Sequence, residues 1–359
     1  MPGLMLRIGL VGTQFIGNLY LNSLKQVPEA AVVAVASPNT AEAFAGRWGI
    51  ERHYKDYRGM IEDCELDAIA IATPNDLHYD ICLAAADAGL HVLCEKPLAL
   101  NLKEADAMVA ACERAGVMLM YAENLLFVPM YNRLRELARK GSVGEPFLVK
   151  QAQCHGGPYS PWFWDIERAG GGVLLDMGCH SISAVCWMMG GWPEAVTATL
   201  GRYAHVEKTL GEDPATVLLH FSGGRLGITE NSWAMPGGND QLEVYGPRGR
   251  LTANLERGPA IAMYRAPESE TALDGSTGAG WQYPLYEEAW QFGFPQELRH
   301  FAEVVAGREE SRSSGADGRR VLEIICAAYE SARTGARVAL PFASDREKPI
   351  DHWLGEAGG

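Results

Sequence analysis

The first 124 residues alternate short, almost wholly apolar segments with stretches that have the periodicity of helices. The apolar segments are predicted strands, and they lie at residues 6–12, 30–37, 66–74, 91–97 and 117–124. Strands that are apolar on both faces are typical of a parallel sheet that helices cover on both sides. We therefore predict a parallel, doubly wound α/β domain over residues 1–124.

Residues 125–359 have a different pattern, with longer segments in which apolar and polar residues alternate. SGG at 222–224 and GPRG at 246–249 are predicted hairpin turns. We predict an antiparallel or mixed sheet with a few helices, and we allow that the C-terminal segment packs back on the first domain. Residues 266–280 are polar and rich in glycine, and they are predicted to form a surface loop. A length of 359 residues suits two domains of this kind.

The charge of the chain narrows the range of partners. Its formal net charge is -14, so its surface repels phosphate backbones and we expect no nucleic-acid partner.

We find no uninterrupted run of about 18 apolar residues, and we expect no membrane span. None of the eight cysteines forms a C-x-x-C pair, which favours a reduced, cytoplasmic setting.

The first predicted strand leads into GTQFIG at residues 12–17, which has the spacing of the dinucleotide-binding turn G-x-G-x-x-G. Gly12 permits the tight turn, and Gly17 permits close packing of the next helix on the strand. Gln14 stands in place of the second glycine, and its amide could bond a phosphate or a ribose. Taken alone, the turn is consistent with a dinucleotide site and equally with a plain strand–turn–helix.

The second predicted strand ends without the acidic residue that binds the adenosine ribose in NAD-specific domains of this type. Ser37, Asn39 and Thr40 stand there instead, and these neutral residues are compatible with NAD or with NADP. No arginine stands in this loop to hold a 2′-phosphate. The pattern therefore favours NAD and leaves NADP possible.

Three further segments give the sequence its most specific signature. HVLCEKPLALN at 91–101 places Glu95-Lys96-Pro97 at the C-terminal end of a predicted strand, where ligands bind in such sheets. Together with IATPNDLH at 71–78 and RAGGGVLLDMGCH at 168–180, it resembles the Gfo/Idh/MocA family, the glucose–fructose oxidoreductase and inositol dehydrogenase group. The resemblance covers nearly the whole chain, including the tail at 315–341.

The resemblance implies an activity and an architecture. Members of the family usually oxidise or reduce a secondary hydroxyl of a sugar, an inositol or a sugar derivative with NAD or NADP. Their fold is a Rossmann domain followed by an α/β domain with a large, mostly antiparallel open sheet, and the nicotinamide and the substrate meet between the two. Subunits often associate through this sheet, so the resemblance implies a homodimer or homotetramer.

The resemblance also assigns residues. The lysine of the E-K-P motif matches Lys96, and the D-x-x-x-H pair of the family matches Asp176 and His180, so these three are the predicted catalytic residues. The predicted cofactor-binding residues are Gly12, Gln14, Phe15, Ile16, Ser37, Thr73, Pro74, Asn75, His78, Glu95 and Lys96.

The chemistry of the side chains supports the same catalytic roles. A histidine can take the alcohol proton as hydride leaves carbon, and Lys96 can stabilise the developing alkoxide. Asp176 precedes His180 by four residues, so its carboxylate could orient the imidazole if the segment is helical. Two alternatives stay open, in which His180 is structural or Asp176 caps a helix. The glycines at 170–172 are expected to let the backbone approach the nicotinamide ring or the substrate.

Aromatic and polar residues mix in the segment at 155–172, as in sites that bind sugar rings, although the same rings could be core at the domain interface. Tyr121 and Asn124 follow the last predicted Rossmann strand and are expected to face the cleft. His155 is expected to contact a substrate hydroxyl or to act as a second acid or base. The predicted substrate-binding residues are Lys96, Tyr121, Asn124, His155, Trp162, Trp164, Asp176 and His180.

Two Cys–His pairs, Cys154–His155 and Cys179–His180, raise the possibility of a metal site. Adjacent residues of a strand point to opposite faces, so neither pair is suited to chelate an ion as a unit. We therefore predict no metal site.

Two rival functions use the same kind of fold. In a redox-assisted lyase or glycosidase, the cofactor oxidises a ring hydroxyl, a neighbouring C–H becomes acidic, a leaving group is eliminated, and hydride returns. A non-catalytic regulator that binds sugar and nucleotide could lack Lys96 or His180, and both are present. Net formation of NADH separates the predicted sugar or polyol dehydrogenase from the lyase.

Overall fold

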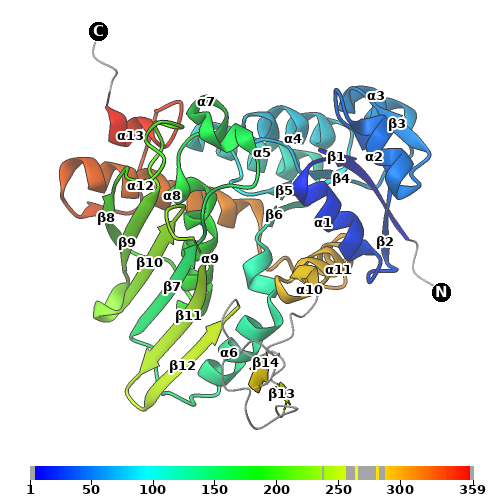
Figure 1. Cartoon of the computed structure of the whole chain (residues 1–359). Helices are drawn as coiled ribbons and strands as arrows, with labels where there is room; N and C mark the ends of the chain where they lie inside the picture. Colours follow the sequence, from blue (N-terminus) through cyan, green and yellow to red (C-terminus); the bar gives the residue numbers. More distant parts are fainter. Residues whose placement is uncertain (1–4, 237, 256–262, 266–279, 283–287, 356–359) are drawn as a thin grey trace, which may run out of the picture.

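The computed structural model describes residues 5–236, 238–255, 263–265, 280–282 and 288–355. Within this part of the chain, an N-terminal parallel sheet and a C-terminal, mostly antiparallel sheet form two domains that lie beside each other (Figure 1). The predicted fold class, a Rossmann domain followed by an α/β domain, is confirmed.

The N-terminal sheet is the parallel sheet that the apolar segments predict. Its strands run in the order β3-β2-β1-β4-β5-β6, and every neighbouring pair is parallel. The strands are β1 (Leu6–Val11), β2 (Ala30–Ala36), β3 (Arg52–Tyr54), β4 (Ala68–Ile71), β5 (His91–Glu95) and β6 (Leu119–Ala122). The short strand β3 is not among the predicted ones, because its residues are exposed or half-buried and lack the apolar pattern. The strand order reverses between β1 and β4, where folds of this kind bind their ligands.

Helices cover both faces of this sheet, which explains why its strands are apolar throughout. Ala68 and Ala70 of β4 belong to one core, and Ile69 and Ile71 belong to the other. The first core includes side chains of α1 and α2, and the second includes side chains of α3, α4 and α5. The helices are α1 (Phe15–Leu24), α2 (Ala41–Trp48), α3 (Tyr57–Asp63), α4 (His78–Asp87) and α5 (Leu102–Ala115).

The C-terminal sheet has the strand order β12-β11-β7-β10-β9-β8-β15. The pair β7 and β10 is parallel, and the other neighbouring strands are antiparallel. The strands are β7 (Leu148–Cys154), β8 (Ala195–Leu200), β9 (Pro214–His220), β10 (Leu226–Ser232), β11 (Asn239–Gly246), β12 (Gly249–Asn254) and β15 (Val338–Ala339). The predicted hairpin turns at 222–224 and 246–249 join β9 to β10 and β11 to β12, so both predictions are confirmed.

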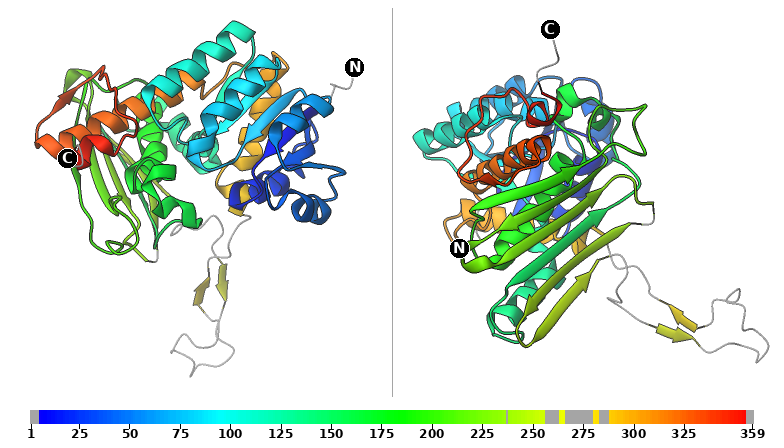
Figure 2. Two further views of the ribbon diagram at one scale, coloured as in Figure 1. Left: turned by 90° about the horizontal axis from the view of Figure 1, so that it is seen from above. Right: turned by 90° about the vertical axis from the view of Figure 1, so that its left-hand side faces the viewer.

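Helices pack on one face of the C-terminal sheet. In this layer α9 lies against β7 and β10, α12 lies against β8, and α6 lies against β12. The helices of this part of the chain are α6 (Pro129–Arg139), α7 (Ile166–Ala169), α8 (Val173–Asp176), α9 (Gly178–Met189), α12 (Gly315–Thr334) and α13 (Asp351–Leu354). The other face is turned to the viewer in the right panel of Figure 2, and none of the described helices covers it. The sheet is therefore open.

The C-terminal third of the chain returns to the Rossmann domain. There, α10 (Glu288–Gln291) and α11 (Phe294–Val305) pack on α1, while α12 packs on α5 and β6 as well as on β8. Phe301 of α11 lies in the same core as Tyr20 of α1. The two domains are therefore joined by packing as well as by the chain, and this packing fixes the position of the site between them.

The predicted surface loop at 266–280 is flanked by a small sheet of β13 (Met263–Arg265) and β14 (Gly280–Gln282). Residues 266–279 lie outside the described residues, so this expectation stays a prediction.

One segment, Ile166–Met189, contains an 18-residue window with a mean hydropathy of 1.3, which is apolar enough for a membrane span. Polar residues interrupt the segment, so it is not an uninterrupted apolar run, and the expectation that the chain has no membrane span stays a prediction. The segment comprises α7, α8 and α9, and 89% of the window is buried inside the protein. Its hydropathy is that of a core element, and the predicted residues Asp176 and His180 lie on it.

Candidate active site

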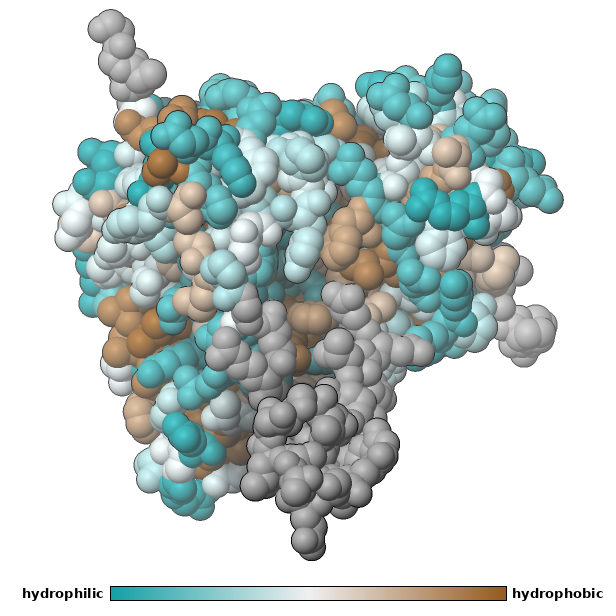
Figure 3. All heavy atoms as spheres, in the orientation of Figure 1, coloured by the Kyte–Doolittle hydropathy of each residue, from teal (hydrophilic) through white to brown (hydrophobic). Residues whose placement is uncertain are grey.

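A cavity of about 680 Å³ lies between the two domains. One wall is formed at the carboxyl ends of β1, β2, β4 and β5, and the other is formed by the ends of β7 and β11 with α8 and α9. Apolar side chains, shown in brown in Figure 3, gather in the hollow between the two halves of the molecule. The predicted site residues that line the cavity are Gly12, Gln14, Phe15, Ile16, Ser37, Thr73, Pro74, Asn75, Glu95, Lys96, Asn124, His155, Trp162, Asp176 and His180.

The glycine turn after β1 has the tight geometry that its sequence predicts. Gly12 has a φ of 112°, and a Cβ built there would lie 2.1 Å from the carbonyl oxygen of Ala72. A Cβ on Gly17 would lie 2.6 Å from the carbonyl oxygen of Gly12. The prediction that Gly17 allows close packing of α1 on the turn is therefore confirmed, and neither glycine tolerates a side chain without movement.

The end of the cavity beside this turn fits a dinucleotide. Helix α1 begins at Phe15, its N-cap residue Gln14 makes no capping hydrogen bond within the described chain, and its first turn holds no acidic residue. The backbone N–H groups of such a first turn favour a phosphate anion. Nearby, the hydroxyl of Thr73 is buried and has no hydrogen-bond partner among the residues that the structure describes. These groups are those that a pyrophosphate and its riboses require.

The ribose end of the cavity holds two basic residues that the sequence reasoning did not include. The hydroxyl of Ser37 lies 2.9 Å from that of Thr40, and the loop of residues 37–40 that carries both holds no charged side chain. Lys55 and Arg58, which lie before and within the first turn of α3, also line the cavity. No arginine stands in the loop after β2, but the fold brings Arg58, from the connection after β3, to the same cavity. Only knowledge of the strand order could have found it.

The lysine of the E-K-P motif is buried and paired. Its ammonium Nζ donates to Oδ1 of Asp176 at 2.7 Å, and the two side chains are only 12% and 6% exposed. Burial alone would lower the pKa of Lys96, but the attraction of Asp176 outweighs it, so the pKa of Lys96 lies above its ordinary value. Burial alone would raise the pKa of Asp176, and Lys96 likewise outweighs it, so that pKa is lowered. The pair is therefore ionised.

The imidazole of His180 is oriented by a residue that the sequence reasoning missed. Its Nδ1 lies 2.6 Å from Oε1 of Glu123, and the side chains of His180 and Glu123 are 9% and 0% exposed. The expectation that Asp176 orients the imidazole is wrong, since the Asp176 carboxylate accepts from Lys96 and from Nε1 of Trp233. Glu123 follows the last residue of β6 and lies between the predicted residues Tyr121 and Asn124, so its place directly after a Rossmann strand was the available signal.

The segment that carries Asp176 and His180 is not a single helix. Asp176 is the last residue of α8 and His180 lies in α9, so the alternative in which Asp176 caps a helix is not supported. The carboxylate of Glu212 accepts from the backbone N–H groups of Gly172 and Leu174, which positions α8. Burial raises the pKa of Glu212 to about 7.

The glycines at 170–172 serve packing rather than ligand approach, which corrects the expectation for them. A Cβ on Gly171 would lie 2.3 Å from the hydroxyl of Tyr329, and one on Gly172 would lie 2.2 Å from the carbonyl oxygen of Glu212. None of the three glycines lines the cavity. Gly171 lets the start of α8 lie close to α12, and Gly172 lets it lie close to the loop before β9.

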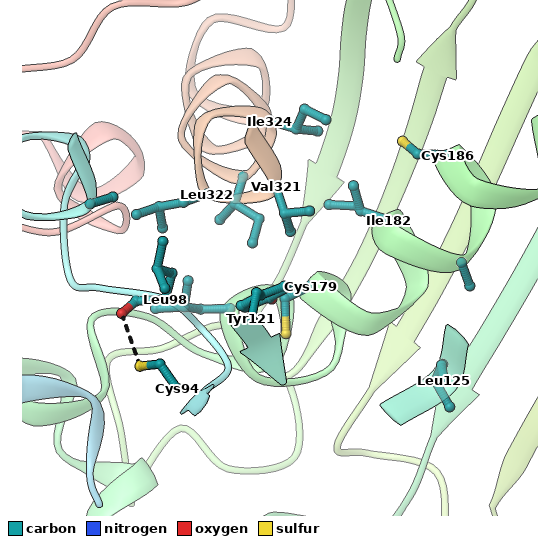
Figure 4. Packing of buried hydrophobic residues seen from close by; sticks show 14 of the residues in the cluster. Cys94, Leu98, Tyr121, Leu125, Cys179, Ile182, Cys186, Val321, Leu322 and Ile324 are labelled. Carbon is teal, nitrogen blue, oxygen red and sulfur yellow. Dashed lines mark hydrogen bonds between the residues drawn. The ribbon is translucent and has the colours of Figure 1, made fainter. Parts of the chain in front are cut away.

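Tyr121 lies in the core, which contradicts the prediction that it binds substrate. It is 1% exposed, it does not line the cavity, and it packs beside Leu98, Cys179 and Leu322 (Figure 4). Asn124, three residues after Tyr121, does line the cavity, and the Asn124 amide donates to the carbonyl oxygen of Phe292.

Two further predicted residues are structural. His78 is fully buried and outside the cavity lining, and its ring nitrogens lie 2.9 Å from the carbonyl oxygen of Pro97 and 3.1 Å from that of Thr73. It thus ties the E-K-P loop to the loop after β4 rather than binding the cofactor. Trp164 packs against Trp233 and His205, so for this ring the core alternative holds.

Aromatic rings nevertheless line part of the cavity. Trp162 and Phe163 stack with ring centroids 3.8 Å apart, and both are lining residues. Tyr159 stacks on Phe15 at 5.0 Å, which joins the aromatic segment to the glycine turn across the mouth of the cavity. Glu95, which also lines the cavity, accepts from the hydroxyl of Tyr20 at 2.7 Å.

His155 lines the cavity, and its ring contacts the sulfur of Met177 and the backbone N–H of Gly157. Burial lowers its pKa. Among the described residues, no group of three or more His, Cys, Asp or Glu side chains is placed to hold a metal ion, and none of the eight cysteines forms a disulfide bond.

The fold, the glycine turn and the buried Lys–Asp and His–Glu pairs on one cavity define an oxidoreductase that depends on a nicotinamide dinucleotide. The model of an oxidoreductase family with an NAD-binding Rossmann fold matches residues 6–123, and the model of the GFO/IDH/MocA C-terminal domain matches residues 131–252. The chain belongs to this family of NAD(P)-dependent sugar and inositol dehydrogenases, as its motifs predict.

Individual relatives agree with this assignment. The chain is 30% identical over 342 residues to myo-inositol 2-dehydrogenase of Thermotoga maritima, which covers 93% of this chain and 98% of the relative. It is similar to the structure of GenD2 from gentamicin A biosynthesis in complex with NAD, with a TM-score of 0.84, 29% identity and coverage of 95% and 99%. It is also similar to a levoglucosan dehydrogenase in complex with NADH and levoglucosan, with a TM-score of 0.80, 26% identity and coverage of 94% and 100%. The predicted NAD cofactor is confirmed at the level of the family.

Proposed function

We propose that this enzyme transfers hydride between NAD and a secondary hydroxyl group of a sugar, an inositol or a related polyol, with Lys96 and His180 acting on the reacting oxygen. The observation that carries the proposal is that both side chains line one cavity with the dinucleotide turn, and each is held by a buried carboxylate. NAD, when bound, accepts the hydride in the oxidising direction. The remaining chemistry belongs to the protein.

Lys96 stabilises negative charge on the substrate oxygen. Asp176 keeps its ammonium charged and fixes its direction, and an ammonium so placed stabilises an alkoxide more strongly in a buried site than in water. Asp176 acts through Lys96 in this scheme and also lines the cavity.

His180 takes the hydroxyl proton in oxidation and returns it in reduction. Its Nδ1 is engaged by Glu123, which leaves Nε2 as the nitrogen for proton transfer. The Glu123 carboxylate holds the ring in one orientation and stabilises the imidazolium that forms, so it is a positioning residue.

The substrate class follows from the lining of the cavity and from the relatives. Trp162 and Phe163 offer apolar surface for the C–H face of a ring, and Asn124, His155 and Gln153 offer polar groups to its hydroxyls. The relatives named for myo-inositol and levoglucosan support the same class.

NAD is the proposed physiological cofactor, and NADP is a second one that the site can accept. The loop after β2 has no carboxylate to repel a 2′-phosphate, while Lys55 and Arg58 line the cavity beside it.

We also propose that the enzyme works in the cytoplasm as a homodimer or homotetramer, joined through the uncovered face of the C-terminal sheet (Figure 2). Light scattering after gel filtration tests the assembly.

The test of the proposed function is the absorbance of reduced nicotinamide, measured with NAD and then with NADP against inositols, aldoses and glycosides, with chromatography of the products. Net NADH together with a ketone or lactone product is the expected result. A cleaved product that requires NAD without net NADH would contradict the proposal and point to redox-assisted elimination.

A further inference from the structure

The inner face of the C-terminal sheet becomes polar where it reaches the cavity. Gln153 of β7 lies directly opposite Asp240 of β11 in the antiparallel register, so their side chains share one face of the sheet. Both are buried, with exposed fractions of 7% and 3%, and both line the cavity that also holds Lys96 and His180. Deeper on the same two strands, this face carries Val149, Leu242 and Val244, as a core does.

Three hydrogen bonds fix the two side chains. Oδ1 of Asp240 accepts from the hydroxyl of Tyr131 at 2.6 Å and from Nε2 of Gln151 at 3.0 Å, while Oδ2 accepts from Nε2 of Gln153 at 3.2 Å. Because the Gln153 nitrogen must face the carboxylate, the assignment of the amide is determined by the contact itself. Its oxygen Oε1 is then left buried and has no hydrogen-bond partner in the described part of the chain.

An acceptor in this position calls for a donor. A buried carbonyl oxygen without a hydrogen bond is costly, and Asp240 Oδ2, which has one protein donor, has capacity for another. No lysine or arginine is among the partners of the two side chains in the described structure, so the local field favours a neutral O–H donor over an anion.

We propose that Gln153 and Asp240 form a second hydroxyl-binding subsite, which receives a hydroxyl of the polyol other than the one that is oxidised. The inference deepens the proposed function and rests on it for the identity of the substrate. It makes Gln153 a specificity-determining residue: the ligand must carry a hydroxyl at a second, defined carbon. An analogue that lacks this hydroxyl loses a donor to Gln153 Oε1 and leaves the oxygen buried without a partner.

The same strand supplies a matched control. Gln151 is buried on the same face, also donates to Asp240, and also has an amide oxygen without a partner in the described structure, but it does not line the cavity. An internal water could satisfy either oxygen. Only Gln153 is placed where a substrate hydroxyl can replace that water, so the two variants Gln153→Met and Gln151→Met separate a ligand contact from a structural one.

The experiment measures polyol binding apart from turnover, which the NADH assay of the proposed function measures. Calorimetric titrations of the NADH-saturated enzyme use myo-inositol, D-xylose and D-glucose, and then the monodeoxy analogues of the tightest binder. In the wild type, one deoxy analogue is expected to bind about tenfold more weakly than its parent, the effect of one lost hydrogen bond to a buried group. Gln153→Met should weaken the parent by a similar factor and abolish the discrimination against that analogue. Gln151→Met should retain the discrimination even if the protein is less stable.

The outcomes distinguish the subsite from the activity. Polyol binding that depends on Gln153 without any NADH formation would contradict the proposed function and support the subsite. Discrimination that survives in Gln153→Met, or equal losses in both variants, would overturn the subsite. So would the absence of binding by all three polyols.

Discussion

Replacing Glu123 with glutamine removes one negative charge from behind the imidazole while keeping the size of the side chain. The backbone N–H of Leu125, which now donates to Oε1 of Glu123, can donate to the glutamine oxygen, so the start of the short helix at 124–127 is retained. The contact with Nδ1 of His180, 2.6 Å long in the wild type, changes from a charge-assisted hydrogen bond to a neutral one. That difference is about 1 to 2 kcal/mol.

The expected loss of kcat is therefore about 5- to 30-fold, since about 1.4 kcal/mol corresponds to a factor of ten in rate. The loss should fall on kcat rather than on the KM for the polyol, because Glu123 acts through the imidazole of His180 and does not itself line the cavity.

The assay is the initial rate of NADH formation at one pH with saturating NAD over a range of polyol concentrations, which gives kcat and KM separately. Glu297→Gln is the matched control, because Glu297 is also fully buried in α11 and its oxygens have no hydrogen-bond partner among the described residues. Burial holds the pKa of Glu297 well above its ordinary value, so the substitution removes little charge. A loss of kcat in Glu123→Gln no larger than in Glu297→Gln, or a loss that appears only in KM, would refute the positioning role.

Three other predictions follow from the same geometry. Lys96→Ala should lower turnover at least about a hundredfold and leave NAD affinity, measured by calorimetry, nearly unchanged, because the ammonium serves the reacting oxygen; unchanged turnover would remove Lys96 from the mechanism. Gln14→Gly should keep or improve NAD affinity, since it restores the second glycine of the turn; a severe loss would mean that the Gln14 amide is itself a ligand. The pKa of Glu212 is raised to about 7, so its proton is retained in the folded state at pH values where the unfolded chain has lost it. The free energy of unfolding should therefore fall by up to about 3 kcal/mol as pH rises from about 4.5 to 7, and this slope should be absent in urea titrations of Glu212→Gln; an equal slope in the variant would assign the effect to other groups.

The parts of the fold that depend on local sequence patterns were predictable. The apolar runs define five of the six Rossmann strands, and the glycine-containing turns mark two hairpins of the second sheet. The strand that was missed, β3, is short and lacks an apolar face. The core role of Ile166–Met189 depends on the packing of α8 and α9 against the C-terminal sheet and α12, and hydropathy alone does not distinguish that from a membrane span.

The site residues that stand in motifs were predictable, whereas the partners that tertiary packing gives them were not. Lys96 and His180 stand in motifs, and the fold brings both to the cavity. Their partners cannot be read from spacing, because Asp176 is four residues from His180 yet pairs with a lysine 80 positions earlier. Tyr121 lies in β6, and Glu123 follows two residues later on the same face of the extended backbone. Tyr121 therefore packs in the core beside Cys179, while Glu123 reaches the imidazole of His180.

The central claim is that His180 and Lys96 act on the hydroxyl of a polyol whose hydride is transferred to NAD. The most direct measurement is NADH formation by NAD-saturated wild-type, His180→Asn and Lys96→Ala proteins with the polyol panel, together with NAD affinity for each. The account predicts stoichiometric NADH and ketone or lactone from the wild type, and both variants binding NAD with NADH formation lowered at least about a hundredfold. Wild-type rates in either variant, or a wild type that binds NAD and reduces it with none of the polyols, would contradict it.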